Sequence, residues 1–327
     1  MNNSFRNVIL KSTGSASISE IEEIQSLWSG YGRISRYTLS GSKIKTVVVK
    51  HVVLPENKKG HDFAESDISH RRKIKSYMVE AAWYRHWSDE CRPFCRIPGC
   101  YALEFGGNEF LTVLEDLDAA GYPGRRSRPS PDEIGICIEW LAEFHSIFMN
   151  REPVNLWKNG TYWHLDTRPD EYKALRDPEL KAAAASIDLK LKKCNFKTIL
   201  HGDAKLDNFC FSDDGKKVAA VDFQYTGGGC GMKDIAYFIG SCLDESECGA
   251  MEDELLDFYF SCLEKSLRKH KPEINFADVE KEWREMYRYA WTDFHRFLKG
   301  WTVMTWKPDS YSEIIAGEII RKLRIEK

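Results

Sequence analysis

One short segment near residue 200 constrains the fold and chemistry of this chain more than any other. It contains the tripeptide His201-Gly202-Asp203 and, five residues after Asp203, Asn208. Short apolar stretches flank this segment, and an Asp-Asp-Gly turn then leads into a third apolar stretch that ends at Asp222. Short apolar stretches joined by turns predict strands, so Asp203, Asn208 and Asp222 are expected at strand ends, close to one another.

An Asp, an Asn five residues later and a second Asp after the next strand form the pattern that kinases use for phosphoryl transfer from ATP. Asp203 is expected to be the catalytic base, because a carboxylate there takes or orients the proton of the attacking hydroxyl. Asn208 and Asp222 are expected to bind Mg²⁺ through their side-chain oxygens. The alternative is a plain tight turn with Asp222 as a capping residue, but the coincidence of so many features favours a kinase catalytic loop.

Length, charge and cysteine usage argue against several classes of protein. A chain of 327 residues can bury a sizeable core and is expected to form two lobes. The net charge of -3 gives no basic field for nucleic acid. No apolar run approaches the roughly 20 residues that span a bilayer, and the N-terminus lacks the apolar core of a secretion signal. Ten scattered cysteines favour reduced thiols. We therefore expect a cytoplasmic monomer or homodimer without nucleic-acid or membrane partners.

Residues 1–116 are expected to form a strand-rich, nucleotide-binding lobe. Ser19 and Glu22 have the spacing of a capping box, and apolar residues follow at helical spacing, so a helix is predicted from Ser19 to Trp28. Alternating and β-branched stretches predict strands, and polar residues up to Ser69 predict a loop. The later elements expected here are strands at 33–39 and 46–54, a helix at 72–87, and strands at 101–105 and 110–114.

Residues 117–327 are expected to form a mainly helical catalytic and substrate-binding lobe. Its first helix follows Ser130, with Pro131 at the first helical position and Glu133 as the partner in a capping box. Strands followed by helices predict an α+β, bilobal protein.

Lys50 interrupts the apolar strand 46–54, where a charge is costly unless it reaches a partner or a wet cleft. The functional interpretation is a lysine that contacts the α- and β-phosphates of ATP and pairs with a helix carboxylate. Glu80 is the first choice for that carboxylate and Glu65 the second. The alternative is a lysine on an edge strand.

Several weaker candidates accompany this lysine. Gly30 and Gly32 lie where a phosphate-covering loop belongs, although a lone Gly-x-Gly is equally typical of an ordinary turn. Glu115 and Leu117 lie where backbone groups would face adenine. Lys205, two residues after Asp203, would neutralise the transferring phosphoryl group, or else be a solvated loop lysine.

Asp234 opens an apolar helix and is expected to brace the catalytic loop rather than to take part in the chemistry.

With these residues in place, the chain resembles the aminoglycoside phosphotransferase and choline kinase group of small-molecule kinases, and most closely its ecdysteroid kinase-like branch. The motifs that carry the resemblance are His201-Gly202-Asp203 with Asn208, Asp222-Phe223-Gln224, Leu114-Glu115-Asp116-Leu117, Leu141-Ala142-Glu143-Phe144-His145 and Asp234-Ile235-Ala236-Tyr237. The resemblance implies a protein kinase-like fold, ATP and Mg²⁺ as cofactors, and transfer of the γ-phosphate to a hydroxyl of a small molecule.

Two other functions remain open. Lys205 is also typical of protein kinases, but only the short segment 223–233 separates Asp222 from Asp234, and no Ala-Pro-Glu element follows. That length favours a small-molecule acceptor over a peptide. An inactive nucleotide-binding scaffold is the second alternative, since a fold alone does not establish activity.

The aromatic residues between Trp283 and Trp306 have two interpretations: a cage that binds a quaternary ammonium, or ordinary packing between helices. Arginines and a lysine in the same segment argue against a polycationic acceptor. A hydroxylated, partly apolar alcohol is the substrate class that this segment favours.

Overall fold

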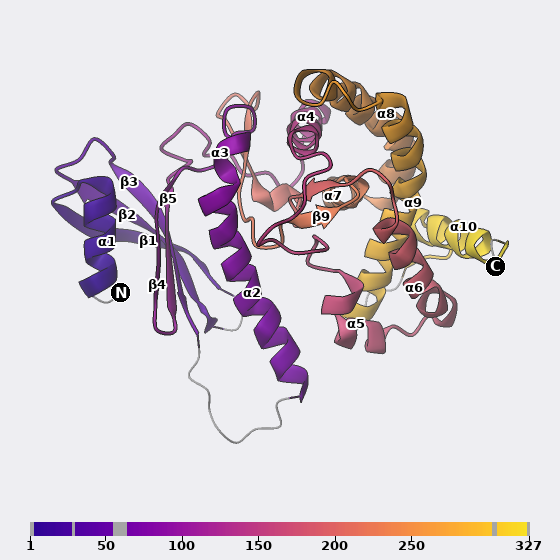
Figure 1. Cartoon of the computed structure of the whole chain (residues 1–327), viewed down its shortest axis with the longest axis horizontal. Coiled ribbons are helices and arrows are strands. Elements are labelled where there is room, and N and C mark those ends of the chain that lie inside the picture. The colour runs from indigo at the N-terminus through magenta and orange to yellow at the C-terminus, as the bar shows by residue number, and fades with distance from the viewer. Residues whose placement is uncertain (1–2, 28–29, 55–63, 303–305, 326–327) are drawn as a thin grey trace.

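The computed structural model describes residues 3–27, 30–54, 64–302 and 306–325, with backbone only at 64–67. The chain forms a sheet-containing N-terminal part and a helical C-terminal part, which lie side by side (Figure 1). This arrangement confirms the predicted α+β, bilobal fold. No helix among the described residues is long and apolar enough to cross a membrane.

A five-stranded antiparallel sheet forms the N-terminal part, in the order β1-β2-β3-β5-β4. The strands and their flanking helices are α1 (Asn3–Thr13), β1 (Ser17–Ser26), β2 (Gly32–Ser40), β3 (Thr46–Val53), α2 (Ala64–His86), α3 (Ser88–Cys91), β4 (Cys100–Gly106) and β5 (Glu109–Glu115). Side chains alternate along β3, so Val47 and Val49 pack with Phe5 of α1, while Lys50 and Val52 face α2 on the other side. The sheet thereby turns Lys50 towards the C-terminal part.

The helix predicted from Ser19 to Trp28 is wrong: residues 17–26 form the edge strand β1, and Trp28 lies outside the described residues. Two irregularities in the pairing with β2 shift the alternation of side chains along β1. Ile18, Ile21 and Ile24 lie three residues apart in the sequence, which imitates helical spacing. Only Ile18 of these is buried, whereas Ile21 is 55% exposed.

The other N-terminal elements differ from expectation mainly in their bounds. The strand predictions are confirmed, and α2 begins at Ala64 rather than at residue 72, so residues 64–69 are helical and not loop. Helix α1 was not predicted from the sequence, although Phe5 and Ile9 are buried on the sheet.

The C-terminal part is mostly helical and carries two small strand pairs, β6 with β9 and β7 with β8. Its elements are α4 (Pro131–Ile147), α5 (Pro169–Ala174), α6 (Pro178–Lys192), β6 (Thr198–Leu200), β7 (Phe209–Phe211), β8 (Val218–Ala220), β9 (Gly227–Gly229), α7 (Met232–Cys242), α8 (Glu245–His270), α9 (Phe276–Trp301) and α10 (Tyr311–Ile325). The predicted capping box of Ser130 and Glu133 is present at α4. The strand pairs place residues 201–208 and 222–226 next to each other, at the junction of the two parts.

Candidate active site

Asp234 fixes the start of the segment 201–208. Its two carboxylate oxygens accept hydrogen bonds from the backbone amides of His201, at 2.7 Å, and Gly202, at 3.0 Å. Gly202 has a φ of 83°, and a Cβ there would lie 2.0 Å from the carbonyl oxygen of Tyr225. Only glycine fits this close approach without displacing backbone. Asp234 is fully buried beside His145, so the loop rests on a rigid support.

His201 joins the two segments that carry the acidic residues. Its Nε2 donates to the carbonyl of Val221 at 3.0 Å, and its Nδ1 accepts from the amide of Asp203 at 3.3 Å. These roles require the neutral ring, and burial lowers the pKa of His201. The histidine therefore sets the position of Asp203 relative to Asp222 without adding charge.

Asn208 holds Asp203 directly. Its Nδ2 donates to the carbonyl oxygen of Asp203 at 2.7 Å and to Oδ2 of the same residue at 3.0 Å. The amide nitrogen is thus committed to Asp203, which leaves Oδ1 of Asn208 as an oxygen ligand for a cation. Burial and the nearby charge of Asp222 raise the pKa of Asp203 to about 7. A carboxylate with that pKa is suited to accept a proton near neutral pH.

Asp222 follows β8 in a strained backbone conformation, with a φ of 68°. Such strain persists only where neighbours fix the residue. Gln224 donates from Nε2 to Oδ1 of Asp222 at 2.8 Å, and Ser76 of α2 donates to Oε1 of Gln224 at 3.0 Å. Burial alone would raise the pKa of Asp222, but the charge of Lys50 and the bond from Gln224 outweigh it and hold the pKa low.

Lys50 reaches from β3 to α2 and forms a buried ion pair with Glu80, with 2.6 Å between Nζ and Oε2. Its Nζ also lies 3.9 Å from Oδ1 of Asp222. Burial opposes the charge on Lys50, but the carboxylates of Glu80 and Asp222 raise its pKa. Glu80 is therefore the carboxylate beside this lysine, while the side chain of Glu65 lies outside the described residues.

The weaker candidates fall around this centre. Gly30 lies between β1 and β2, and Gly32 is the first residue of β2, where a Cβ would meet the carbonyl oxygen of His51 at 2.0 Å. Glu115 uses its amide in a bond to Gly99, and the Leu117 carbonyl accepts from Tyr122. Within the described residues, the amide of Leu117 has no hydrogen-bond partner.

Lys205 is partly exposed, and its Nζ lies 3.5 Å from Asp207. Its positive charge still opposes the rise in the pKa of Asp203, so the two side chains are electrostatically linked.

Sequence reasoning did not single out several residues at this site. Tyr237, three residues after Asp234, lies beside Asp203. Burial and the charge of Asp203 raise the pKa of its phenol. Tyr162 contacts Tyr237 with ring centroids 5.5 Å apart. Lys73 of α2 forms no ion pair within the described residues, and burial together with the charge of Lys50 lowers its pKa to about 8. The motif at 234–237 held the signal for Tyr237, whereas Tyr162 lies in a stretch without periodic pattern.

Comparison with known proteins bears on this site. Residues 165–271 match the model of the Ecdysteroid kinase-like family. The matched range contains Asp203, Asn208, Asp222 and Asp234, and the resemblance predicted from their motifs is confirmed over that range. A comparison with curated proteins gives no match.

Two solved structures with similar folds are named as small-molecule kinases. A choline kinase from Cryptosporidium parvum Iowa II is 10% identical, with a TM-score of 0.51, and the match covers 99% of this chain and 95% of that one. A protein assigned as a fructosamine-3-kinase from Thermobifida fusca YX-ER1 is 13% identical, with a TM-score of 0.52 and coverage of 99% and 98%. At these identities the comparison shows the fold, which is the protein kinase-like fold of small-molecule kinases.

The donor set fits a magnesium nucleotide. Asn208 and Asp222 offer hard oxygen ligands, which Mg²⁺ prefers, and Mg²⁺ commonly takes its remaining ligands from phosphates and water. Within the described residues, no group of three or more His, Cys, Asp or Glu side chains is arranged to hold a metal. The buried Lys50 places a positive charge 3.9 Å from Asp222, where it fits the charge of phosphates.

Proposed function

We propose that this protein is a magnesium- and ATP-dependent phosphotransferase that moves the γ-phosphate to a hydroxyl of a small molecule. The observation that carries the proposal is the convergence of Asp203, Asn208, Asp222 and the Lys50–Glu80 pair at the junction of the two parts. The family match over residues 165–271 supports the same activity. The division into a nucleotide-binding lobe, 1–116, and a catalytic lobe, 117–327, is part of this proposal.

Each residue has a role that follows from its contacts. Asp203 is the catalytic base, because its pKa of about 7 lets it accept the hydroxyl proton near neutral pH. Asn208 and Asp222 hold the metal, which would neutralise and orient the phosphates when bound. Lys50, aligned by Glu80, binds the α- and β-phosphates. Lys205 and Lys73 add positive charge near the transferring group.

The nucleotide base is proposed to lie against the segment after β5. The amide of Leu117, which has no partner within the described residues, is a donor there, with the Glu115 backbone beside it. Gly30 and Gly32, at the start of β2, cover the phosphates.

The acceptor is proposed to bind on the side of Asp203 that faces Tyr162 and Tyr237. The aromatic stripe of α9 is mostly core, since Trp283, Tyr287 and Trp291 are buried, so these residues do not form a quaternary-ammonium cage. Phe297 instead contacts Tyr162, with ring centroids 5.3 Å apart. An aromatic surface beside the base suits a hydroxylated, partly apolar small-molecule alcohol.

The experiment is a phosphate-transfer assay with radiolabelled ATP, Mg²⁺ and a panel of alcohols: choline, ethanolamine, a fructosamine, streptomycin and a hydroxylated steroid. Asp203→Asn is expected to lower turnover by about 10²–10⁴ while ATP binding is retained. Asp207→Asn is the matched control, because Asp207 lies in the same loop and is exposed. Unchanged turnover in Asp203→Asn would remove this residue from the mechanism.

Protein phosphorylation and an inactive scaffold remain the alternatives. Phosphate transfer to a protein substrate but to no alcohol in the panel would favour the first. ATP binding without any transfer or ATP hydrolysis would favour the second.

A further inference from the structure

Residues 160–162 run beside the catalytic loop and are tied to it by backbone hydrogen bonds. The amide of Tyr162 donates to the carbonyl of Gly202 at 3.2 Å, and the amide of Thr161 donates to the carbonyl of Tyr225 at 3.2 Å. The ring of Tyr162 then contacts Tyr237, the neighbour of Asp203. A shift of residues 160–162 would therefore move the aromatic rings that lie next to the proposed catalytic base, Asp203.

Arg168 closes the segment into a loop. Its Nε donates to the carbonyl of Tyr162 at 2.6 Å, and its guanidinium lies over the rings of Tyr162 and Phe297, at 5.4 and 5.3 Å from their centroids. We call Tyr162, Arg168, Tyr237 and Phe297 the acceptor wall. The wall combines aromatic surface with one cation, and all of it lies on the helical part of the protein.

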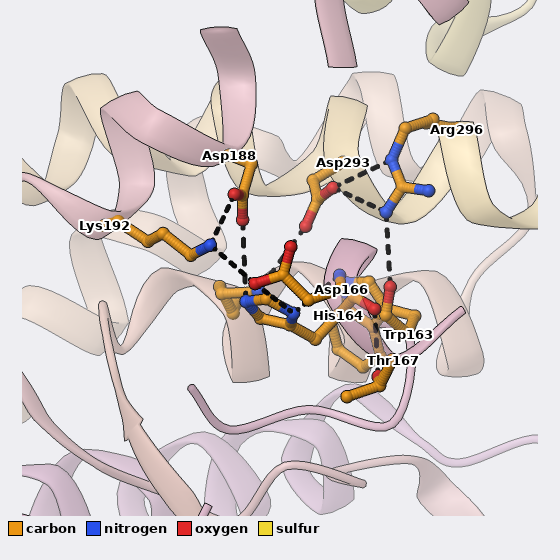
Figure 2. A network of polar contacts seen from close by, with 9 residues as sticks. Trp163, His164, Asp166, Thr167, Asp188, Lys192, Asp293 and Arg296 are labelled. Atoms are coloured by element: carbon orange, nitrogen blue, oxygen red, sulfur yellow. Dashed lines mark hydrogen bonds and ion pairs between the residues drawn. The ribbon is translucent and has the colours of Figure 1, made fainter. Parts of the chain in front are cut away.

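A chain of buried charges holds this loop from behind (Figure 2). Arg296 of α9 donates to the carbonyl of Trp163 at 3.2 Å and to Oδ1 of Asp293 at 2.8 and 3.0 Å. The other oxygen of Asp293 lies 3.4 Å from Nζ of Lys233. Arg296 and Asp293 are 1% exposed and Lys233 is 5% exposed, so none of these charges is solvated.

The same figure shows a second group of polar side chains, which joins the loop to α6. His164 lies 3.6 Å from Asp188, and Lys192 bridges Asp188 and Asp166 at 2.7 and 3.0 Å. The loop is therefore fixed to both α6 and α9.

Lys233 and Asp234 are neighbours in the first turn of α7, and each serves a different segment. Asp234 accepts from the amides of the catalytic loop, while Lys233 acts through Asp293 and Arg296 on the loop that carries the acceptor wall. One rigid helix start thus locates both the base and the wall. Buried charge chains are seldom better for stability than apolar packing, so a geometric role accounts for this one more readily than stabilisation does.

We propose that Asp293 and Arg296 are positioning residues that set the acceptor wall opposite Asp203 and so determine which alcohols are phosphorylated. This inference rests on the proposed function. Within the described residues, neither side chain contacts the residues proposed to bind the nucleotide, so their loss should affect the acceptor and spare ATP.

The test compares Arg296→Met with Arg284→Met, a control on the same helix whose ion pairs are with Asp257 and Glu280 at the surface. The substrate is the alcohol with the highest turnover in the panel above, and hydrolysis of ATP without alcohol serves as a second reaction. Arg296→Met is expected to raise the acceptor KM by about tenfold or more, with the ATP KM and ATP hydrolysis within about twofold of wild type. The control should change neither. Parallel loss of hydrolysis and transfer, or an unchanged acceptor KM, would overturn the inference.

Two further variants and one further measurement keep the test decisive. Arg296→Lys retains the charge and should recover part of the acceptor KM, and Asp293→Asn, which is nearly isosteric, replaces Arg296→Met if that variant does not fold. Hydrogen exchange needs no acceptor: amides at 160–168 should exchange about tenfold faster in the variant while those at 201–208 do not. Unchanged exchange at 160–168 would contradict the positioning role. A wild type without ATP hydrolysis or transfer would instead reject the proposed function.

Discussion

Lys50 of the sheet and Glu80 of α2 form a buried ion pair with 2.6 Å between their charged atoms. Each side chain is 5% exposed. The pair joins the centre of the sheet to the helix that faces the C-terminal part, and Asp222 lies 3.9 Å from the same lysine. The proposed nucleotide end of the site is therefore assembled by three segments that are distant in sequence.

Removing one partner of this pair should lower the free energy of unfolding more than replacing both partners. Lys50→Met leaves Glu80 buried without its partner, and the free energy of unfolding is expected to fall by roughly 3–5 kcal/mol. Lys50→Met combined with Glu80→Leu should regain most of that loss, although neither variant should bind ATP. Urea unfolding measures both stabilities. A double variant as unstable as the single one would show that the pair is not the main interaction of these side chains.

The glycine of the catalytic loop gives a second prediction with an internal control. Gly202→Ala places a Cβ 2.0 Å from the Tyr225 carbonyl, whereas Gly121, with a similar φ of 90°, has open space around it. Gly121→Ala should cost about 1–2 kcal/mol from its backbone conformation alone. Gly202→Ala should cost clearly more and also lower turnover, since the loop must move. Thermal unfolding and the transfer assay measure the two effects, and equal losses in both variants would count against a tight loop.

His164 gives the stability of the protein a defined dependence on pH. Burial and the charge of Lys233 lower the pKa of His164 to about 4, so the folded protein holds this ring neutral. The unfolded chain binds the proton near its ordinary pKa of about 6.5. Between these values the unfolded state binds more protons, so stability is full above about pH 6.5 and falls as the pH drops towards 4, by on the order of 3 kcal/mol.

Urea unfolding at pH 7.5 and pH 4.5 tests this for wild type and His164→Gln. The wild type should lose more stability than the variant on going to the lower pH. A pH-independent difference between the two proteins would mean that His164 does not titrate as described.

The sequence predicted which residues the fold brings together at the site, but it did not predict all of the elements around them. Asp203, Asn208 and Asp222 are close in sequence and occur in a recognisable pattern, so a single chain sufficed to propose them. Strand β1 was predicted as a helix because Ser19 and Glu22 have capping-box spacing and Ile21 and Ile24 lie three residues apart. The pairing with β2 that makes this stretch an edge strand depends on another part of the chain, which local pattern does not contain.

The buried charges that hold the loop of the acceptor wall could not be predicted from the sequence, for a related reason. Arg296 and Trp163 are 133 residues apart in sequence, and their contact depends on how α9 packs. Lys233 and Asp293 are individually ordinary residues of charged, helix-rich segments. Only the folded chain shows that they are buried and joined to each other.

The most direct test of the account is thermal unfolding with ATP, with Mg²⁺, with both and with neither, for wild type and Asp222→Ala. Asp213→Ala, at an exposed turn residue, is the control. Wild type and control should be stabilised by ATP with Mg²⁺, by about 2.7 kcal/mol at a nucleotide concentration one hundred times Kd. Asp222→Ala should lose the magnesium-dependent part. No stabilisation of the wild type by ATP with Mg²⁺, or an equal magnesium-dependent stabilisation in Asp222→Ala, would contradict the proposed nucleotide site.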